Sequence, residues 1–117
     1  MRSAPRSGYK EVSGDGYLKR IVLEAEDIGV KGTLLQEVQF IAGDKVAFHF
    51  HKVTREIFFC LQGPAPFVIN GQSVVMNEGD CLVCEPEDVH GNPVIKNDFR
   101  ILVLKVGFKE ADTVWLD

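Results

Sequence analysis

Three histidines and one glutamate have the residue types and the spacing of a metal site. His49 and His51 stand two positions apart within residues 47–51, a segment whose composition favours a β-strand. Side chains on a strand alternate between its faces, so both imidazoles point to one side, with Cα atoms about 6.6 Å apart. Two ring nitrogens at that separation can meet at one ion. On the residues alone, a solvent-facing or hydrogen-bonded histidine pair remains the alternative interpretation.

Glu56 and His90 are expected to complete this site. The short charged link at residues 52–55 allows a hairpin, which would bring the Glu56 carboxylate beside the two imidazoles, and His90 follows a further turn. Three imidazoles and one carboxylate suit one divalent transition metal (Fe, Mn, Ni, Co or Zn) better than calcium or magnesium, which prefer oxygen cages. On an octahedral ion these ligands leave positions open for water, dioxygen or a chelating substrate.

The segments around these residues indicate many short strands. Eleven glycines and five prolines separate segments rich in Val, Ile, Phe and Leu, which is typical of antiparallel strands joined by turns, and no helix is predicted. Asn70-Gly71 predicts a type I′ hairpin, because both residues accept positive φ. The predicted strands are residues 18–25, 33–42, 46–51, 56–62, 66–70, 73–77, 81–85, 89–95 and 99–107. Such a chain predicts an all-β fold, either a closed barrel or a jelly roll.

Composition excludes several classes of function. The chain has 117 residues, enough for one domain, and a net charge of −4 with scattered Lys and Arg, which argues against a nucleic-acid partner. No apolar segment reaches the roughly 20 residues that cross a membrane, and none follows the basic start, so a cytoplasmic location without a membrane partner is predicted. We predict a flexible or dimer-contacting arm at residues 1–16 and a barrel domain at residues 17–117.

The spacing of the candidate ligands resembles the cupin superfamily. The first cupin motif, Gly-x5-His-x-His-x(3,4)-Glu-x6-Gly, is matched at every position by residues of this chain: Gly43, His49, His51, Glu56 and Gly63. In the second motif, Gly-x5-Pro-x-Gly-x2-His-x3-Asn, Gly79 and His90 match at the expected separation. Glu85 and Glu87 replace the first proline and the glycine, Pro86 matches a second proline that many cupins carry, and the asparagine is absent.

The resemblance covers about residues 18–108 and implies more than the residues alone do. It implies a double-stranded β-helix (a jelly-roll barrel) that forms a single cupin domain. It also implies that a metal ion lies near the middle of the cavity, and that the chain forms a homodimer, as most small members do. The departures in the second motif concern turn geometry and pocket electrostatics rather than the ligands.

Alternation along the Glu56 strand suggests which side chains surround the ion. Phe58, Cys60 and Gln62 share the ligand face, although Cys60 could instead be packed in the core. An apolar set on the outward faces needs a cover, and a second subunit is a simpler source than the N-terminal segment. This outward set consists of Phe48, Phe50, Ile57, Phe59 and Leu61.

Three further sets of residues admit a structural or a functional interpretation. Lys52 and Arg55 face an acidic cluster at residues 85–88, and they either are solvated loop charges or steer an anionic substrate. Trp115 is expected to be a packing or interface anchor rather than part of the site. Cys81 and Cys84 should point to opposite faces of a strand as reduced thiols, so they should not form a metal knuckle.

The sequence is compatible with two functions for the metal site and with a third, purely structural role. The first is a metal-dependent enzyme acting on a small oxygen-rich metabolite, as a dioxygenase, an isomerase or epimerase, or a decarboxylase. The second is a non-catalytic, metal-dependent binding or sensor protein, because no acid or base stands out beyond the ligands. In the third, the metal only stabilises the fold, and its removal would unfold the chain.

Overall fold

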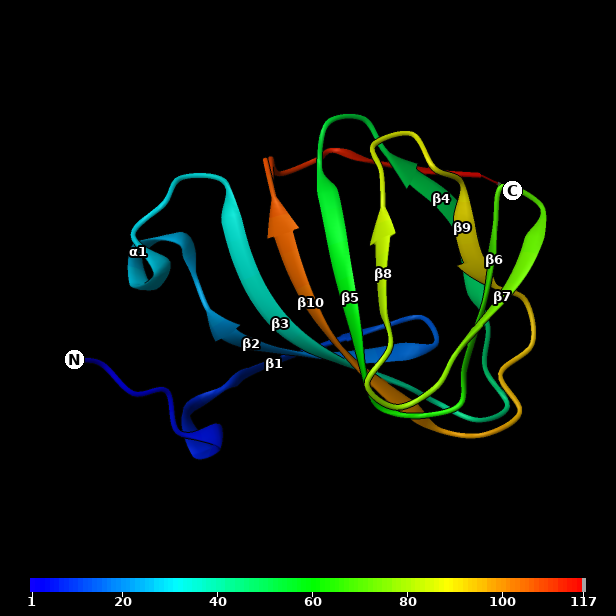
Figure 1. The fold of residues 1–117 in the computed structure, drawn as a ribbon, viewed down its shortest axis with the longest axis horizontal. Coiled ribbons are helices and arrows are strands. Elements are labelled where there is room, and N and C mark those ends of the chain that lie inside the picture. Colours follow the sequence, from blue (N-terminus) through cyan, green and yellow to red (C-terminus); the bar gives the residue numbers. More distant parts are fainter. Residues whose placement is uncertain (117) are drawn as a thin grey trace.

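The computed structural model describes residues 1–116 and contains two antiparallel sheets that face each other (Figure 1). In order across the six-stranded sheet, the strands are Lys10–Gly14 (β1), Tyr17–Leu23 (β2), Thr33–Phe40 (β3), Phe99–Val106 (β10), Arg55–Gln62 (β5) and Cys81–Cys84 (β8). Across the five-stranded sheet they are Thr113–Trp115 (β11), Val46–His51 (β4), His90–Asn92 (β9), Ala65–Ile69 (β6) and Gln72–Met76 (β7).

The strand connections make this fold a jelly roll. The chain alternates between the two sheets from β3 to β6 and again from β7 to β10, which is the path of a double-stranded β-helix. The predicted all-β class and jelly-roll fold are therefore confirmed. Within residues 1–116 the two sheets are separate hydrogen-bonded ladders, so the fold is not a closed barrel.

The predicted hairpin at Asn70-Gly71 is confirmed, whereas several strand bounds differ. Both residues have positive φ, 50° and 77°, and they join β6 to β7. The strand predicted at residues 89–95 shortens to His90–Asn92, because Pro93 lacks the N–H that a ladder needs. β1 and β11 were not predicted, since all five residues of β1 are exposed and give no alternating pattern, and β11 is only three residues long.

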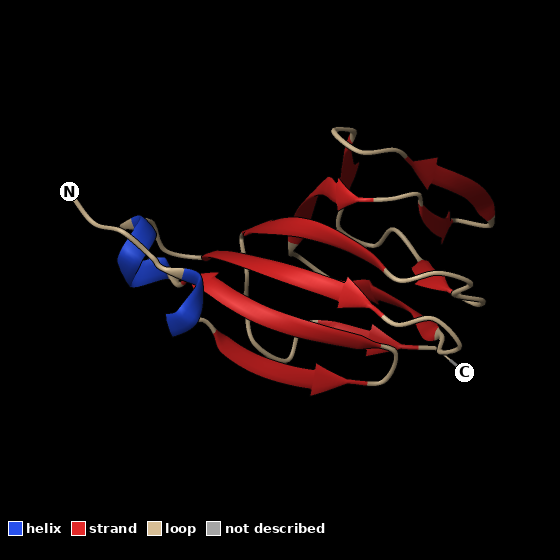
Figure 2. Cartoon of the chain, turned by 90° about the horizontal axis from the view of Figure 1, so that it is seen from below, coloured by secondary structure: helices blue, strands red, loops and turns tan. Residues whose placement is uncertain are grey.

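Two helical turns differ from the prediction of no helix. They are a 3-10 turn at Arg6–Gly8 and the short helix α1 at Ala25–Ile28 (Figure 2). No helix in the described chain is long and apolar enough to cross a membrane. α1 is too short for a periodic apolar face, so it leaves little trace in the hydrophobic pattern.

The N-terminal segment is tied to the six-stranded sheet. β1 pairs with β2 from Lys10 to Gly14, and Arg6 makes two short hydrogen bonds to the carboxylate of Glu37 on β3. Glu37 is only 4% exposed. The predicted domain boundary after residue 16 and the predicted contact of this segment with a second subunit stay predictions.

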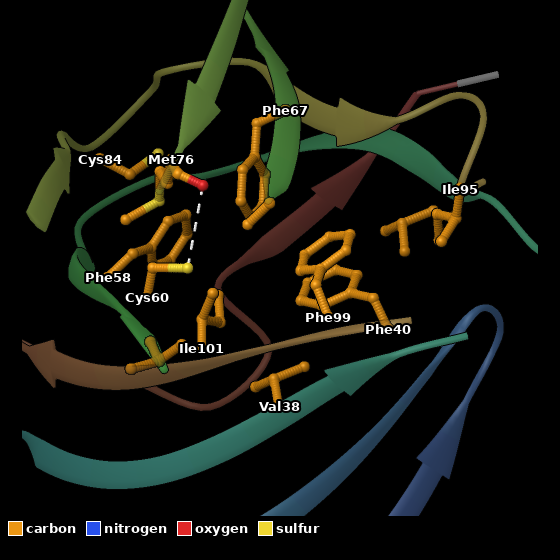
Figure 3. Close-up of a cluster of buried hydrophobic side chains, with 13 residues drawn as sticks. Val38, Phe40, Phe58, Cys60, Phe67, Met76, Cys84, Ile95, Phe99 and Ile101 are labelled. Carbon is orange, nitrogen blue, oxygen red and sulfur yellow. Dashed lines mark hydrogen bonds between the residues drawn. The ribbon is translucent and has the colours of Figure 1, made fainter. Parts of the chain in front are cut away.

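The hydrophobic core lies between the sheets and forms the base on which the polar residues sit. Phe40 and Phe99 stack with ring centroids 4.4 Å apart, and Phe67 meets both rings edge-on (Figure 3). Burying one such side chain stabilises the fold by about 1.5–3 kcal/mol. Phe58 stacks on Phe67 and also approaches the ring of His90, at 6.2 Å. The core therefore continues directly into the histidine cluster.

The predicted outward apolar residues lie on two different sheets. Phe48 and Phe50 belong to β4 in the five-stranded sheet, while Ile57, Phe59 and Leu61 belong to β5 in the six-stranded one. They therefore cannot form one continuous face, because the two sheets turn their outer surfaces in opposite directions.

Candidate metal centre

Each candidate ligand is placed by a strand, and the strands come from both sheets. His49 and His51 lie on β4, His90 lies on β9 of the same sheet, and Glu56 lies on β5 of the facing sheet. His49 and His90 are direct cross-strand partners. Gly91 permits this pairing, because a Cβ there would stand 2.9 Å from the carbonyl oxygen of Val46.

The three imidazoles form one compact cluster. The ring centroids of His49 and His90 are 4.2 Å apart, and each lies 5.5 Å from the ring of His51. One ring nitrogen from each histidine falls within 4.8 Å of the others. Alternation on β4 had predicted that His49 and His51 share a face, and both line the same cavity.

Hydrogen bonds at one ring nitrogen leave the other ring nitrogen free. Nδ1 of His49 donates to the carbonyl oxygen of Ala47 at 2.9 Å, and Nδ1 of His90 donates to that of Asp88 at 2.9 Å. Nδ1 of His51 lies 3.0 Å from the hydroxyl oxygen of Thr113. Partners of this kind fix the tautomer of a metal-binding histidine and present its Nε2 lone pair.

Glu56 brings an oxygen to the cluster that has no hydrogen-bond donor. Its Oε1 atom lies 2.9 Å from Nε2 of His51 and 3.3 Å from Nε2 of His90, yet it is buried without a hydrogen bond. Neighbouring ligands on an ion with bonds of about 2.1 Å stand about 3.0 Å apart in an octahedron and about 3.4 Å apart in a tetrahedron. These contacts have the spacing of atoms that share an ion.

The ligand atoms fall into two overlapping groups rather than one. The three histidines form the first group, and Glu56 forms the second with His90 and Cys84. The Sγ atom of Cys84 lies 3.3 Å from Nδ1 of His90. His90 and His51 therefore link Glu56 to the imidazole cluster.

Burial and neighbouring charges set the protonation of the cluster. Burial lowers the pKa of His49 to about 4, so this imidazole is neutral near pH 7. Burial raises the pKa of the Glu56 carboxyl, but contacts with His51 and His90 outweigh it and hold that pKa below its usual 4.5. Burial also opposes protonation of His90, whereas Cys84 and Glu56 raise its pKa to about 10. A cation at His90 would have to displace a proton.

The structure places one of the three predicted lining residues at the cavity. Phe58 lines the cavity, whereas Cys60 and Gln62 do not. Cys60 is 1% exposed and its thiol faces the carbonyl oxygen of Met76, 3.8 Å away, which is the core position given as its alternative (Figure 3). A register shift opposite Leu61 reverses the alternation, so Gln62 is exposed and accepts a hydrogen bond from Arg100.

Several lining residues were missed by the sequence analysis. Trp115 stacks on His49 with ring centroids 4.4 Å apart, so it belongs to the site and not only to packing.

Arg55 pairs with Glu85 at 2.7 Å on the surface, as a solvated loop charge would. The cations that line the cavity are instead Lys19 and Lys105. The cavity volume is about 80 Å³.

The two strand cysteines point to opposite faces, as predicted, but only Cys84 is the buried residue that was expected at both positions. Cys81 is exposed and Cys84 is buried, so their side chains lie on opposite faces of β8, and all three cysteines are free thiols. The sequence did not predict that Cys84 lies beside His90. Their contact depends on the path of the loop between the end of β8 and the start of β9.

A family match and a short curated match bear on this arrangement. The cupin domain family matches residues 36–104, from β3 to β10. Quercetin 2,3-dioxygenase of Bacillus subtilis (strain 168) is 35% identical over 48 residues, which is 41% of this chain. That alignment spans only 14% of the length of the dioxygenase.

Solved structures share the fold across nearly the whole chain. The polyketide cyclase RemF of Streptomyces resistomycificus aligns with a TM-score of 0.80 and 20% identity, covering 100% of this chain and 87% of that one. The nucleoside dehydratase Pac13 of Streptomyces aligns with a TM-score of 0.78 and 11% identity, covering 99% and 91%. A predicted oxalate decarboxylase of Thermotoga maritima aligns with a TM-score of 0.74 and 20% identity, covering 90% and 98%. With this fold and a family match over more than half of its length, the chain belongs to the cupin family.

Proposed function

We propose that this cupin is a metal-dependent enzyme acting on a small oxygen-rich metabolite, with His49, His51, Glu56 and His90 as ligands of one divalent transition metal. One observation carries the proposal. Each imidazole has its Nδ1 atom engaged by a neighbour, and the buried Oε1 atom of Glu56 has no donor, although two Nε2 atoms lie within 3.3 Å of it. A cation that displaces the proton of His90 would give these buried donor atoms a shared partner, which an enclosed polar atom otherwise lacks.

The chain's own residues would position the ligands and exclude water. When bound, a divalent transition metal supplies Lewis acidity or, for a redox-active ion, chemistry with dioxygen. Thr113 and the carbonyl oxygen of Asp88 hold two imidazoles in register, and Trp115 and Phe58 cover the cluster with aromatic surface. A cavity of about 80 Å³ restricts the reacting part of the substrate to a small group.

The similar proteins support a reaction on a small molecule without selecting one. Their names describe a dioxygenase, a dehydratase, a polyketide cyclase and a predicted oxalate decarboxylase. The reaction types we consider for this chain are dioxygenation, isomerisation or epimerisation, and decarboxylation. All three use an ion that polarises or oxidises an oxygen-bearing carbon.

A non-catalytic binding or sensor protein is the second candidate. Apart from the four candidate ligands, the titratable residues that line the cavity are Tyr17, Lys19 and Lys105. β2 brings Tyr17 to the cavity, where burial raises its pKa. Phenol and ammonium groups are weak acids, which suits ligand binding at least as well as proton abstraction.

One experiment separates the enzyme from the binding protein. Wild-type protein loaded with iron(II) is screened for oxygen consumption, and protein loaded with zinc, nickel or manganese is screened by NMR for product formation, against 2-oxo acids, enediols and sugars. Turnover that is lost in His51→Ala supports the enzyme. Saturable binding of a compound without any turnover supports the binding protein and contradicts the proposed activity.

We further propose that a second copy of the chain covers the outer face of the six-stranded sheet. Cross-strand pairs there join Leu104 with Ile57, and Leu102 with Phe59, and Phe59 is 39% exposed. Exposed apolar surface of this kind marks an interface. Light scattering after gel filtration should give a dimer for wild type and a monomer for Phe59→Lys, with Val12→Lys as an exposed-site control. A monomeric wild type would contradict this proposal.

A further inference from the structure

Three polar side chains of the cavity wall have no protein partner. Lys105 is 6% exposed and Gln36 is 3% exposed, and both line the cavity. Within residues 1–116, neither side chain makes a hydrogen bond or an ion pair, and the same holds for Lys19. The two ammonium groups approach only aromatic rings, Lys19 that of Tyr17 at 5.1 Å and Lys105 that of Phe108 at 5.0 Å.

The sheet register places these side chains beside the candidate metal centre. β2, β3, β10 and β5 are neighbours in the six-stranded sheet, and they contribute Lys19, Gln36, Lys105 and Glu56 in that order. Lys105 stands directly opposite Glu56 across the β10–β5 ladder. Lys19 pairs with Val38 and Gln36 pairs with Val103, so the three side chains run diagonally across the sheet and end at Lys105, beside a candidate ligand.

Two cations in this position share one carboxylate of the cavity wall, Glu56, whose charge acts on both. Glu56 is the one carboxylate among the described residues that line the cavity, and it already contacts His51 and His90. With a divalent ion in place, the ion and the two ammonium groups would outweigh that single negative charge. A buried ammonium without a counter-ion is unfavourable. The burial of Lys19 also lowers its pKa, and Lys105 adds to this effect.

We propose that Lys105 and Lys19 bind a carboxylate group of the substrate, with the Gln36 amide as a further donor, so that the substrate is a small carboxylic acid whose other oxygen atoms reach the metal centre. The role of the ion rests on the proposed function, whereas the anion site stands on the lysines alone. A cavity of about 80 Å³ has room for a small group, and a planar carboxylate with a short carbon chain is of that kind.

The larger hollow beside the cavity supports access for such a molecule. Lys19, Gln36 and Lys105 also line this second hollow, whose volume is about 320 Å³. The same three side chains therefore border both spaces, and the second one is also lined by Lys109 and by the carboxylates of Glu110 and Asp112. Lys52 and Arg55, which the sequence analysis considered for this role, are exposed residues that do not line the cavity.

Binding of three probes to metal-free and cobalt(II)-loaded protein tests the proposal. The probes are pyruvate, its uncharged analogue pyruvamide, and inorganic phosphate, each followed by calorimetry. The variants are Lys105→Met, which keeps the length of the side chain, Lys105→Arg, which keeps the charge, and Lys96→Met as an exposed lysine control. Cobalt content and the melting temperature are measured for every protein, so that metal loading, folding and anion binding are separate readouts.

The proposal expects pyruvate to bind wild type more tightly than pyruvamide. Lys105→Met should lose about tenfold or more in pyruvate affinity, the usual scale for a hydrogen bond to a charged group, while Lys105→Arg retains part of it and Lys96→Met all of it. Cobalt content should stay equal in all four proteins. The melting temperature of Lys105→Met should rise, because an unpaired buried charge is removed.

Three results would overturn the proposal. They are equal binding of pyruvate and pyruvamide, unchanged pyruvate affinity in Lys105→Met, and tighter binding of phosphate than of pyruvate, which would assign the lysines to a phosphate group. Failure of the wild type to take up cobalt would refute the metal centre instead. The metal-free titrations then decide the anion site, since pyruvate binding that depends on Lys105 supports it and absence of such binding refutes it.

Discussion

At the scale of single residues, the site depends on which nitrogen of each histidine is left free. Thr113 faces Nδ1 of His51 at 3.0 Å, and main-chain carbonyl groups accept hydrogen bonds from His49 and His90. The backbone partners are built into β4 and the turn before β9. Thr113 is the one of these partners that a substitution can remove without changing the path of the chain.

Replacing Thr113 with valine should weaken metal binding and leave the fold intact. Valine has nearly the shape of threonine but cannot accept the proton on Nδ1 of His51. Loss of a partner of this kind typically lowers metal affinity by about 10-fold to 100-fold. Competition against a chelator of known affinity measures the change in zinc affinity.

Thr33→Val is the control, because the Thr33 hydroxyl bonds to the carbonyl oxygen of Val30 in an exposed turn. Equal zinc affinity in Thr113→Val and wild type would show that this hydroxyl has no orienting role.

The candidate ligands could be predicted from the sequence, but the cations of the cavity wall could not. The ligands follow a motif spacing, and alternation on one strand is enough to bring His49 and His51 together. β10 gives no such guide, because Ile101 and Val103 face inward while Leu102 and Leu104 face outward, and all four are apolar. The alternation of polar and apolar residues that would assign Lys105 to a face is therefore missing.

At the scale of elements, the link between β4 and β5 is fixed by one buried carboxylate. Asp112 accepts hydrogen bonds from the backbone N–H groups of Val53 and Thr54 and from the Thr54 hydroxyl, the last at 2.7 Å. The predicted hairpin at residues 52–55 is wrong, because β4 and β5 lie in facing sheets and the link crosses between them. Asp112 precedes Thr113 and β11, so it joins this link to the strand that holds the ring of His51. A change at Asp112 should therefore alter both the link between β4 and β5 and the position of the His51 ring.

Asp112→Asn should destabilise the protein and weaken metal binding together. The three donors meet at one oxygen of Asp112, Oδ2, and an amide oxygen there lacks the negative charge that strengthens these hydrogen bonds. Loss of hydrogen bonds to a buried charged group costs about 1–3 kcal/mol. Urea unfolding measures the first effect and chelator competition the second. Asp44→Asn, at an exposed loop residue, should change neither. Reduced stability with unchanged metal affinity would contradict the coupling.

The N-terminal segment is held by a carboxylate whose charge depends on pH. The Arg6 guanidinium, with Arg100 beside it, outweighs burial and lowers the pKa of Glu37 from 4.5 to about 2. A carboxyl whose pKa is lower in the folded state stabilises the fold fully above the unfolded value. That contribution is lost as the pH falls from about 4.5 toward 2.

Glu37→Gln should therefore change the pH dependence of stability. The variant should be less stable than wild type at pH 7, and the difference in the free energy of unfolding should shrink below about pH 4.5. Urea unfolding between pH 3 and pH 7 measures this difference, with Glu78→Gln at an exposed turn as the control. A difference that stays constant over this range would mean that Arg6 and Arg100 do not hold the charged form of Glu37.

Sequence patterns predicted the long strands and missed what interrupts them. The strands at residues 33–40, 46–51 and 55–62 carry clear β composition and were predicted within one or two residues. The register shift opposite Leu61 moved Gln62 out of the cavity, and nothing in the residues of β5 marks it. Such a bulge is decided by the partner strand, which lies about 40 residues away along the chain.

At the scale of the whole molecule, the candidate centre joins the two sheets. The histidines come from the five-stranded sheet and Glu56 from the six-stranded one, and within residues 1–116 the two ladders share no strand. An ion held by all four residues would add a direct link between the sheets. The jelly-roll fold could be predicted because the motif spacing assigns the ligands to particular strands. That the two sheets do not close into a barrel depends on strand pairing, which local sequence does not encode.

Metal binding should therefore raise the stability of the entire chain. A ligand that binds only the folded state at 100 times its Kd adds about 2.7 kcal/mol, which for a domain of this size raises the melting temperature by about 10 °C. Scanning calorimetry of metal-free and zinc-loaded protein measures the shift, and His90→Ala should abolish it. A transition that zinc leaves unchanged would contradict a link between the sheets.

Calorimetric titration of the metal-free chain with cobalt(II) tests the central claim most directly. Four side chains that converge on one ion predict a single saturable site with a stoichiometry of one ion per chain. Separate replacement of His49, His51 and His90 by alanine should each remove most of the heat, and Glu56→Gln should weaken it. An absence of saturable heat in wild type, or a titration that the histidine replacements leave unchanged, would contradict the account.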